Sequence, residues 1–261
     1  MWRRKDWVQL LRYATVVWYK TYANLKGENE KTYLGCLWWA LEPMINTAVF
    51  YVVFVYILKN RTEGFVIFLY IGMVVYGWFA NGINAGANSI VTHAGLMQQI
   101  KLPKLLFPII SVSNLSWKFV FSLAVLFPLI WILHAPITWA YLALPFLLML
   151  QYFVIIAIGL PFAALIPYFQ DGRTVIATFL SVFIWLSGVF YRRAQVPENL
   201  QDIFYMNPAA ALIEAYRNIL LDGQWPHWME LVNVLVIGLV FFMIGMILLR
   251  KVDKHLLKLP L

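Results

Sequence analysis

The sequence predicts an all-α integral membrane protein with six transmembrane helices, an amphipathic interface helix before them and a short re-entrant or interfacial helix before the last span. Hydrophobic residues make up 62% of the 261 residues and charged residues only 12%, and the mean hydropathy is +0.74. The apolar stretches run for about 20 residues or more without alternating polar positions, which is typical of helical spans and not of strands. A soluble domain cannot bury this much apolar surface, so lipid must surround most of it. Residues 1–261 are therefore expected to form one transmembrane domain.

Residues 1–32 are predicted to form an interfacial helix followed by a polar elbow. Between Trp7 and Leu25, apolar and aromatic side chains recur every three or four residues, and the cations fall largely elsewhere around the helix. This pattern is typical of a helix that lies in the headgroup region, with its tryptophans at the interface and its cations near phosphates.

Six apolar runs within residues 33–249 are each interpreted as a span. They lie at about 33–58, 65–85, 105–133, 139–167, 174–191 and 229–249. Prolines inside several runs predict kinked rather than straight helices. Residues 250–261 are expected to form a cytoplasmic tail.

Two connections are longer than the topology requires. Residues 88–100 can form a short helix on the cytoplasmic side. On the outer side, Asn207 and Pro208 have the pattern of an N-cap followed by proline at the first helical position, and Gly223 is expected to close that helix. The outer helix is too short to span a bilayer, so it is predicted to be interfacial or re-entrant.

The distribution of lysine and arginine predicts that both termini are cytoplasmic. Most of the 20 basic residues fall in residues 1–32, 86–104, 168–173 and 250–261, which share one side in the six-span arrangement. The formal net charge of +8 is therefore interpreted through topology and anionic lipid headgroups. No nucleic-acid partner is expected.

The chain has no recognisable set of catalytic residues. It lacks the GxxxxGK[ST] loop that cradles nucleotide phosphates, its four histidines are far apart, and its single cysteine, Cys36, lies in an apolar run. We therefore expect no enzyme activity, no metal and no cofactor in this chain. A membrane protein without its own chemistry most simply moves a substrate across the bilayer.

Two charged residues fall inside predicted spans and are candidates for function. Glu42 precedes Pro43 in the first run, and Lys118 lies in the third. Each costs about 2.5–3.5 kcal/mol at mid-bilayer on insertion scales. The alternative is that each faces the protein interior and pairs with polar neighbours, or snorkels.

Aromatic residues make up 17% of the chain, and some lie deep in the predicted spans. Most tryptophans and tyrosines fit interfacial positions. The deep ones in the first and fifth runs offer flat faces that suit the C–H faces of sugar rings, although for any single residue lipid contact or helix packing is the better explanation. The deep aromatic residues are Trp38, Trp39, Phe50, Tyr51, Phe54, Phe179, Phe183, Trp185, Phe190 and Tyr191.

The assembled pattern resembles the permease subunit of ABC-type polysaccharide exporters, the O-antigen and capsule exporters being the nearest branch. The resemblance covers nearly the whole chain. It rests on the order of the elements and on three local marks, which are the stretch from Tyr33 to Pro43, the stretch from Lys101 to Pro108, and Tyr205 to Pro208 followed by Tyr216, Arg217 and Gly223.

This resemblance implies a homodimer in a bacterial inner membrane that binds two copies of a separate ATPase subunit, which would hold ATP and magnesium. The substrate would be a glycan on a polyprenyl pyrophosphate lipid, within surrounding membrane lipids. The helix within 88–100 would couple to the ATPase through Ser89, His93, Leu96, Met97 and Lys101. Arg3, Arg4, Lys5 and Arg12 would attract the lipid pyrophosphate at the entry. The channel would be lined by Trp38, Trp39, Phe50, Tyr51, Phe54, Phe183, Trp185 and Tyr191.

Three alternatives remain open at this stage. An ABC permease for drugs or small lipids shares the six-span arrangement. A membrane-embedded transferase acting on lipid-linked sugars would work without an ATPase partner. An ion-coupled carrier would depend on Glu42 and on the membrane potential. The scattered acidic residues and histidines count against the last two.

Overall fold

The computed structural model describes residues 4–57, 59, 64–99, 102–132, 138–192 and 195–256, and this described part consists of helices and connecting turns. The helices are α1 (Arg4–Glu30), α2 (Trp38–Tyr51), α3 (Phe65–Thr92), α4 (Ala94–Gln99), α5 (Leu106–Ile132), α6 (Leu144–Leu165), α7 (Gly172–Phe183), α8 (Glu198–Tyr205), α9 (Pro208–Leu220) and α10 (Trp228–Leu256). Short 3₁₀ turns precede α2 at Gly35–Leu37, precede α6 at Trp139–Ala143 and follow α7 at Ile184–Leu186, and a π-helix continues α2 over Val52–Ile57.

Five helical stretches of the described chain are long and apolar enough to cross a membrane. They are Gly35–Ile57, Phe65–Thr92, Leu106–Pro128, Trp139–Leu165 and Trp228–Lys251. The predicted span at 174–191 corresponds to a shorter apolar helix, Gly172–Leu186, because the chain turns at Gly188, whose φ is +68°. At 1.5 Å per residue this helix is about 22 Å long, less than a hydrocarbon core of about 30 Å.

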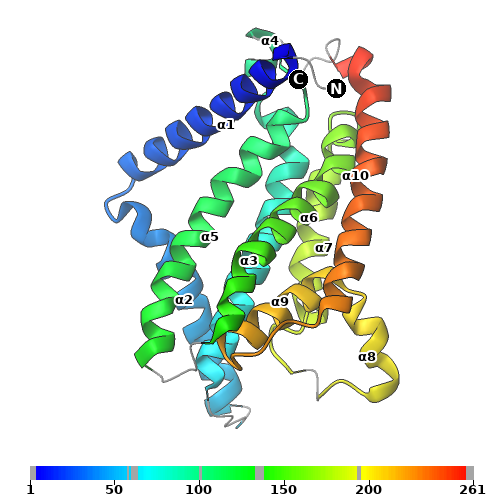
Figure 1. Cartoon of the computed structure of the whole chain (residues 1–261). Coiled ribbons are helices and arrows are strands. Elements are labelled where there is room, and N and C mark those ends of the chain that lie inside the picture. Colours follow the sequence, from blue (N-terminus) through cyan, green and yellow to red (C-terminus); the bar gives the residue numbers. More distant parts are fainter. Residues whose placement is uncertain are drawn as a thin grey trace.

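The chain passes repeatedly between the two ends of an elongated bundle (Figure 1). The start of α1, the helix α4 and the end of α10 lie at one end, and α8 and α9 lie at the other. The helix α7 connects the first of these ends to the second. The start of α1 and the end of α10 therefore share the end of the bundle at which α4 lies.

The helix α3 is the centre of the bundle. It contacts α2, α5, α6, α7 and α9, and 72% of its most apolar window is buried, against 11% for the window that contains α2. Gly82 and Gly86 form a GxxxG pair that allows α6 to approach closely: a Cβ on Gly159 of α6 would lie 3.3 Å from the carbonyl oxygen of Ile83. On the other face of α6, a Cβ on Gly245 of α10 would lie 2.8 Å from the side chain of Leu160.

Two predicted boundaries on the α4 side are wrong. The second span was expected to end near residue 85, but α3 continues to Thr92. The short helix expected over 88–100 begins only at Ala94 and ends at Gln99, because the backbone of His93, with φ −104° and ψ 18°, leaves the helical conformation and ends α3. Polar residues lowered the hydropathy after residue 85 without ending the helix.

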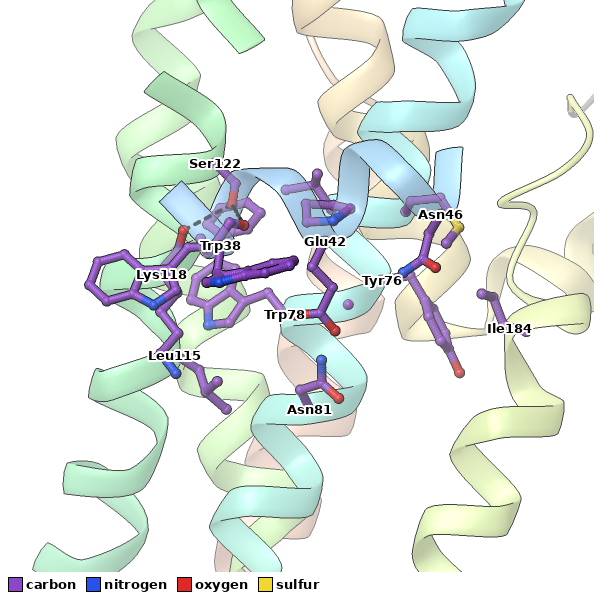
Figure 2. A pocket seen from close by; sticks show the side chains of 16 residues that line it. Trp38, Glu42, Asn46, Tyr76, Trp78, Asn81, Leu115, Lys118, Ser122 and Ile184 are labelled. Carbon is purple, nitrogen blue, oxygen red and sulfur yellow. Dashed lines mark hydrogen bonds between the residues drawn. The ribbon is translucent and has the colours of Figure 1, made fainter. Parts of the chain in front are cut away.

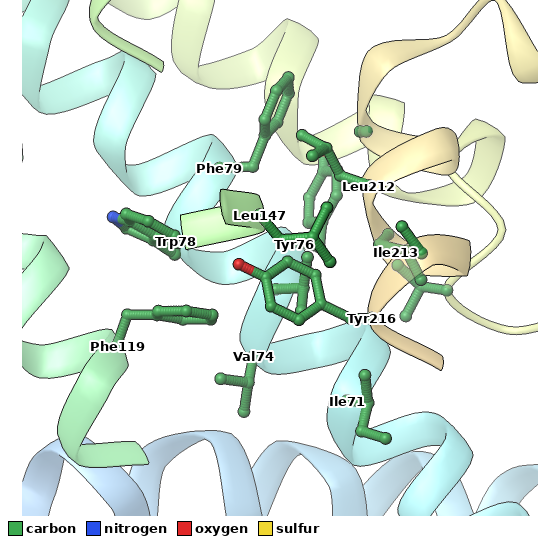
Figure 3. Close-up of a cluster of buried hydrophobic side chains, with 14 of the residues drawn as sticks. Ile71, Val74, Tyr76, Trp78, Phe79, Phe119, Leu147, Leu212, Ile213 and Tyr216 are labelled. Carbon is green, nitrogen blue, oxygen red and sulfur yellow. The ribbon is translucent and has the colours of Figure 1, made fainter. Parts of the chain in front are cut away.

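The predicted caps of α9 are confirmed, but its burial was not expected. The Asn207 side chain accepts from the backbone N–H of Ala209 at 2.9 Å and of Ala210 at 3.5 Å, and Gly223 beyond the helix has a φ of +62°. Most of α9 is buried against α3, α6 and α10. Figure 3 shows Tyr216 of α9 inside the bundle, where its ring meets Phe119 of α5 edge-on at 5.9 Å.

Candidate functional site

A cavity of about 260 Å³ lies where α2, α3 and α5 meet, with Ile184 after α7 at its edge. We call it the aromatic cavity because its described lining includes Trp38, Trp39, Tyr76, Trp78 and Phe119 (Figure 2). The first residues of α2 reach it because Trp38, Glu42 and Asn46 recur every four positions and so share one helix face.

The rings around the aromatic cavity are held by neighbours. Trp78 and Phe119 are stacked with centroids 4.2 Å apart, and Trp39 meets Phe121 edge-on at 5.8 Å. The Ser122 hydroxyl donates to the backbone oxygen of Trp39 at 2.7 Å, which fixes the start of α2 on α5. Trp38 is less restrained, with 44% of its surface exposed.

Both predicted intramembrane charges line this cavity. The Glu42 carboxylate points towards Asn81 of α3 (Figure 2) and forms no ion pair within the residues that the structure describes. Lys118 Nζ lies 2.5 Å from a carboxylate oxygen of Glu28 in α1 and 5.9 Å from the Trp39 ring centroid. The Lys118 charge is thus compensated by an acid about 90 positions earlier in the sequence, a pairing that no local pattern reveals.

A second, polar cavity of about 800 Å³ adjoins the first between α1, α3 and α5. We call it the polar groove, because asparagine side chains from all three helices line it. Asn81 and Lys118 line both cavities, so these side chains stand at the boundary between the two. The asparagines of the groove are Asn24, Asn81, Asn84, Asn88 and Asn114.

Sequence reasoning missed the groove, although a signal was present. Asn81, Asn84 and Asn88 follow the i, i+3, i+7 spacing of one helix face. The predicted end of the second span near residue 85 divided this row between a span and a loop, so it was not recognised as one polar face of α3.

Three of the other predicted channel residues pack around Phe190. Its ring centroid lies 4.8 Å from that of Phe50, 5.4 Å from Phe54 and 4.6 Å from Trp185. The Tyr191 hydroxyl donates to the backbone oxygen of Trp185 at 2.9 Å.

Two of the predicted channel residues take other partners. Tyr51 meets Tyr56 edge-on at 6.2 Å, and Phe183 stacks on Phe179 at 5.2 Å. The predicted track is therefore divided, with Trp38 and Trp39 in the aromatic cavity and most of the rest packed around Phe190.

The predicted coupling residues differ in their surroundings. Ser89 is fully buried within α3, so it offers no surface to another subunit. The His93 ring lies 2.8 Å through Nδ1 from the Ser89 carbonyl and stacks on Phe107 at 5.7 Å. Leu96 is half-buried and Met97 is buried in a small core with Phe107. Lys101 lies outside the described residues.

The predicted entry cations are described only in part. Arg3 lies outside the described residues, and Arg4 and Lys5 are described only as part of the α1 backbone. Arg12 is exposed on α1. No group of histidine, cysteine or acidic residues among the described residues is placed to hold a metal ion.

Arg217 of α9 is buried with only 3% of its surface exposed, and sequence analysis assigned it no structural role. Its guanidinium donates to the backbone oxygens of Gly188 at 2.7 Å, Val189 at 2.8 Å and Phe68 at 3.1 Å, and it lies 3.4 Å from the Phe68 ring centroid. This side chain fastens the turn after α7 to α3. Nearby, burial raises the pKa of Glu214, and the charge of Arg217 opposes part of this increase.

Comparison with known proteins identifies the family to which this chain belongs. The family model described as ABC-2 type transporter matches residues 17–221. An O-antigen export system permease protein RfbA of Klebsiella pneumoniae is 20% identical over 234 residues, covering 88% of this chain and 89% of the relative. A protein of the same name from Myxococcus xanthus is 23% identical over 220 residues, covering 83% of this chain and 84% of the relative. The matched region includes the second half of α1 and the whole of α2, α3 and α5, which surround both cavities, so this chain belongs to the ABC-2 type transporter membrane family.

Proposed function

We propose that this chain is the permease subunit of an ATP-driven exporter that moves a lipid-linked polysaccharide of the O-antigen class across the bacterial inner membrane. The observation that carries the proposal is the similarity to O-antigen export permeases over more than four fifths of the chain and of each relative. The aromatic cavity supports it, since flat rings and polar groups suit sugar faces and hydroxyls.

In this function the chain crosses the bilayer six times, with α7 as the short fifth crossing and α8–α9 as a re-entrant pair on the outer side. The connection that α7 makes between the two ends of the bundle supports this count. The excess of cations in residues 1–32 and 250–261 supports cytoplasmic termini, and α4, at the same end of the bundle, then faces the cytoplasm in this proposal.

A second copy of the chain and two ATP-binding subunits complete the proposed transporter. The absence of a phosphate-binding loop from the sequence supports a separate ATPase that binds ATP and magnesium. The helix α4, at the end of the bundle, is its docking element. In this proposal the two copies face each other across the channel through α2 and α7, whose exposed apolar side chains include Ile45, Val49, Phe179 and Val182.

The test is to delete the gene in its host and to assay glycan on both sides of the inner membrane. Loss of surface glycan with accumulation of full-length lipid-linked glycan inside is the expected result. Failure to make any glycan favours a transferase instead. Normal surface glycan refutes the polysaccharide assignment and leaves a permease for drugs or small lipids.

A further inference from the structure

The polar groove presents a row of amides at the depth of a membrane span. Asn81, Asn84 and Asn88 lie on one face of α3, within the stretch Phe65–Thr92 that is long and apolar enough to cross the membrane. Two helical turns, about 10 Å, separate the first from the last. Ser111 and Asn114 of α5 line the groove with this row. Transfer of an asparagine side chain into hydrocarbon costs free energy, so this face of α3 needs hydrogen-bond partners.

The described residues satisfy only part of the hydrogen-bonding capacity of these asparagines. The Asn88 amide nitrogen donates to Asn84, to its backbone oxygen at 2.8 Å and to its side-chain oxygen at 3.0 Å. The side-chain oxygens of Asn88 and Asn114 are buried and accept no hydrogen bond from the residues that the structure describes. These two oxygens are closed off from solvent, so a ligand in the 800 Å³ groove meets the amides that the groove exposes. Asn81 is exposed, and its side chain forms no hydrogen bond with the residues that the structure describes, so it can bind a ligand rich in hydroxyl groups.

The groove also carries more positive than negative charge. Lys20 of α1, Lys31 directly after α1 and Lys118 of α5 line it, with Glu28 as the acidic residue among its lining. Lys118 lies about 18 Å along α5 from its start at Leu106, and Glu28 beside it belongs to the last turn of α1. The ion pair thus holds the end of α1 against the middle of α5, where the groove meets the aromatic cavity.

We propose that the polar groove is the loading site for the sugar–phosphate junction of the lipid-linked glycan. The asparagines bind the hydroxyls of the first sugars, and the lysines bind the phosphate. A ligand phosphate competes with Glu28 for Lys118, which releases the end of α1 from α5 and connects the groove with the aromatic cavity. This inference rests on the proposed function, and it adds the residues and the order of events at loading.

Ligand binding to the purified permease–ATPase complex tests the site. The probes are a polyprenyl pyrophosphate carrying a disaccharide, the same polyprenyl pyrophosphate without sugar, and phosphatidylglycerol, each titrated by native mass spectrometry. Wild type is expected to bind the glycosylated probe about tenfold more tightly than the sugar-free probe. The Asn81→Leu/Asn84→Leu variant is expected to lose this preference while it still binds the sugar-free probe.

Charge variants test the competition at Lys118. Lys118→Met is expected to weaken both pyrophosphate probes about tenfold, because a charge-assisted contact is lost. Glu28→Gln is expected to tighten both probes severalfold, because Lys118 no longer needs to be freed, and a gain in affinity does not result from misfolding. The matched controls are Lys26→Met and Glu30→Gln. Lys26 and Glu30 form an ion pair on α1, the helix that carries Glu28, and they line neither cavity. Neither control is expected to change binding.

Several results would overturn the inference. Unchanged sugar preference in the asparagine variant, or unchanged affinity in both charge variants, removes the site. Equal binding of phosphatidylglycerol and the glycosylated probe by wild type makes the groove an ordinary lipid headgroup site. These outcomes leave the proposed function intact, since that function fails only when deletion of the gene leaves surface glycan normal.

Discussion

Replacement of Arg217 tests whether one buried side chain fastens the outer end of the bundle. Arg217→Met keeps the length of the side chain and removes the charge and every donor. The backbone oxygens of Gly188 and Val189, now bonded at 2.7 and 2.8 Å, would then be buried without these donors. A buried polar group without its hydrogen bond costs about 1–3 kcal/mol, and loss of the contact with the Phe68 ring adds about 1–2 kcal/mol.

With about 1–1.5 kcal/mol for each of the two oxygens, the low end of that range, the expected destabilisation of Arg217→Met is about 3–5 kcal/mol. A chain of this size loses about 2–4 °C in melting temperature for each kcal/mol, so a decrease of about 10 °C is expected. Arg217→Lys, which retains charge but not the planar fork, should fall between the variant and wild type. The assay is thermal unfolding of the detergent-purified protein, followed by fluorescence-detected size-exclusion chromatography. A decrease of less than about 2 °C for Arg217→Met would refute this structural role.

Gly72 provides an independent test of the same contact. A Cβ at Gly72 would lie 2.6 Å from Nη2 of Arg217 and 3.2 Å from the carbonyl oxygen of Val189, whereas a Cβ at Gly77 on the same helix would meet nothing within 4 Å. Gly72→Ala is therefore expected to lower the melting temperature and Gly77→Ala to leave it unchanged or raised. If the clash is with the guanidinium, Gly72→Ala costs less in the Arg217→Met background. Equal costs in both backgrounds would place the clash elsewhere.

Three further predictions concern α4, the aromatic residues and α9. Leu96→Pro breaks α4 and is expected to leave ATP hydrolysis running without export; unchanged coupling, measured as glycan exported per ATP hydrolysed, would place the coupling element elsewhere. Alanine at Trp38, Tyr51 or Trp185 is expected to reduce surface glycan while the complex still assembles, and normal glycan in all three variants would remove the aromatic track. Glu214→Gln is expected to raise the melting temperature at pH 8 and to change it little at pH 4. Burial raises the folded-state pKa of Glu214 above its unfolded value, so the stability of the native protein falls as pH rises through the folded-state pKa; an equal shift at both pH values would contradict this reasoning.

The sequence predicted those parts of the fold that depend on local composition. Long apolar runs identified five stretches with the length and composition of spans, and Asn207-Pro208 identified the start of α9. The end of α3 was missed because Asn84 and Asn88 lower the local hydropathy, yet the helix continues where their side chains face the polar groove. Hydropathy reports the average environment of a segment and cannot reveal one polar face on a membrane helix.

The candidate site was predictable only as separate residues. The cost of burying charge singled out Glu42 and Lys118, but that both line one cavity follows from the packing of α2, α3 and α5. The pairing of Lys118 with Glu28, and of Arg217 with the carbonyls of Gly188 and Val189, joins segments far apart in the chain. Such long-range polar contacts depend on tertiary structure, and the spacing of residues within one helix carries no record of them.

The glycine contacts of α6 have a mechanical consequence. Gly159 brings the backbone of α6 almost onto the backbone of α3, and the side chain of Leu160 of α6 fills the space over Gly245 of α10. Helices packed this closely cannot slide without clashes. A displacement received at α4 would therefore be carried by these three helices as a rigid body. The stretch that contains α2 has only 11% of its most apolar window buried, so its displacement would disrupt few contacts within the chain. Opening the channel would then mainly move the stretch that contains α2, which has few buried contacts, while α3, α6 and α10 keep their mutual packing.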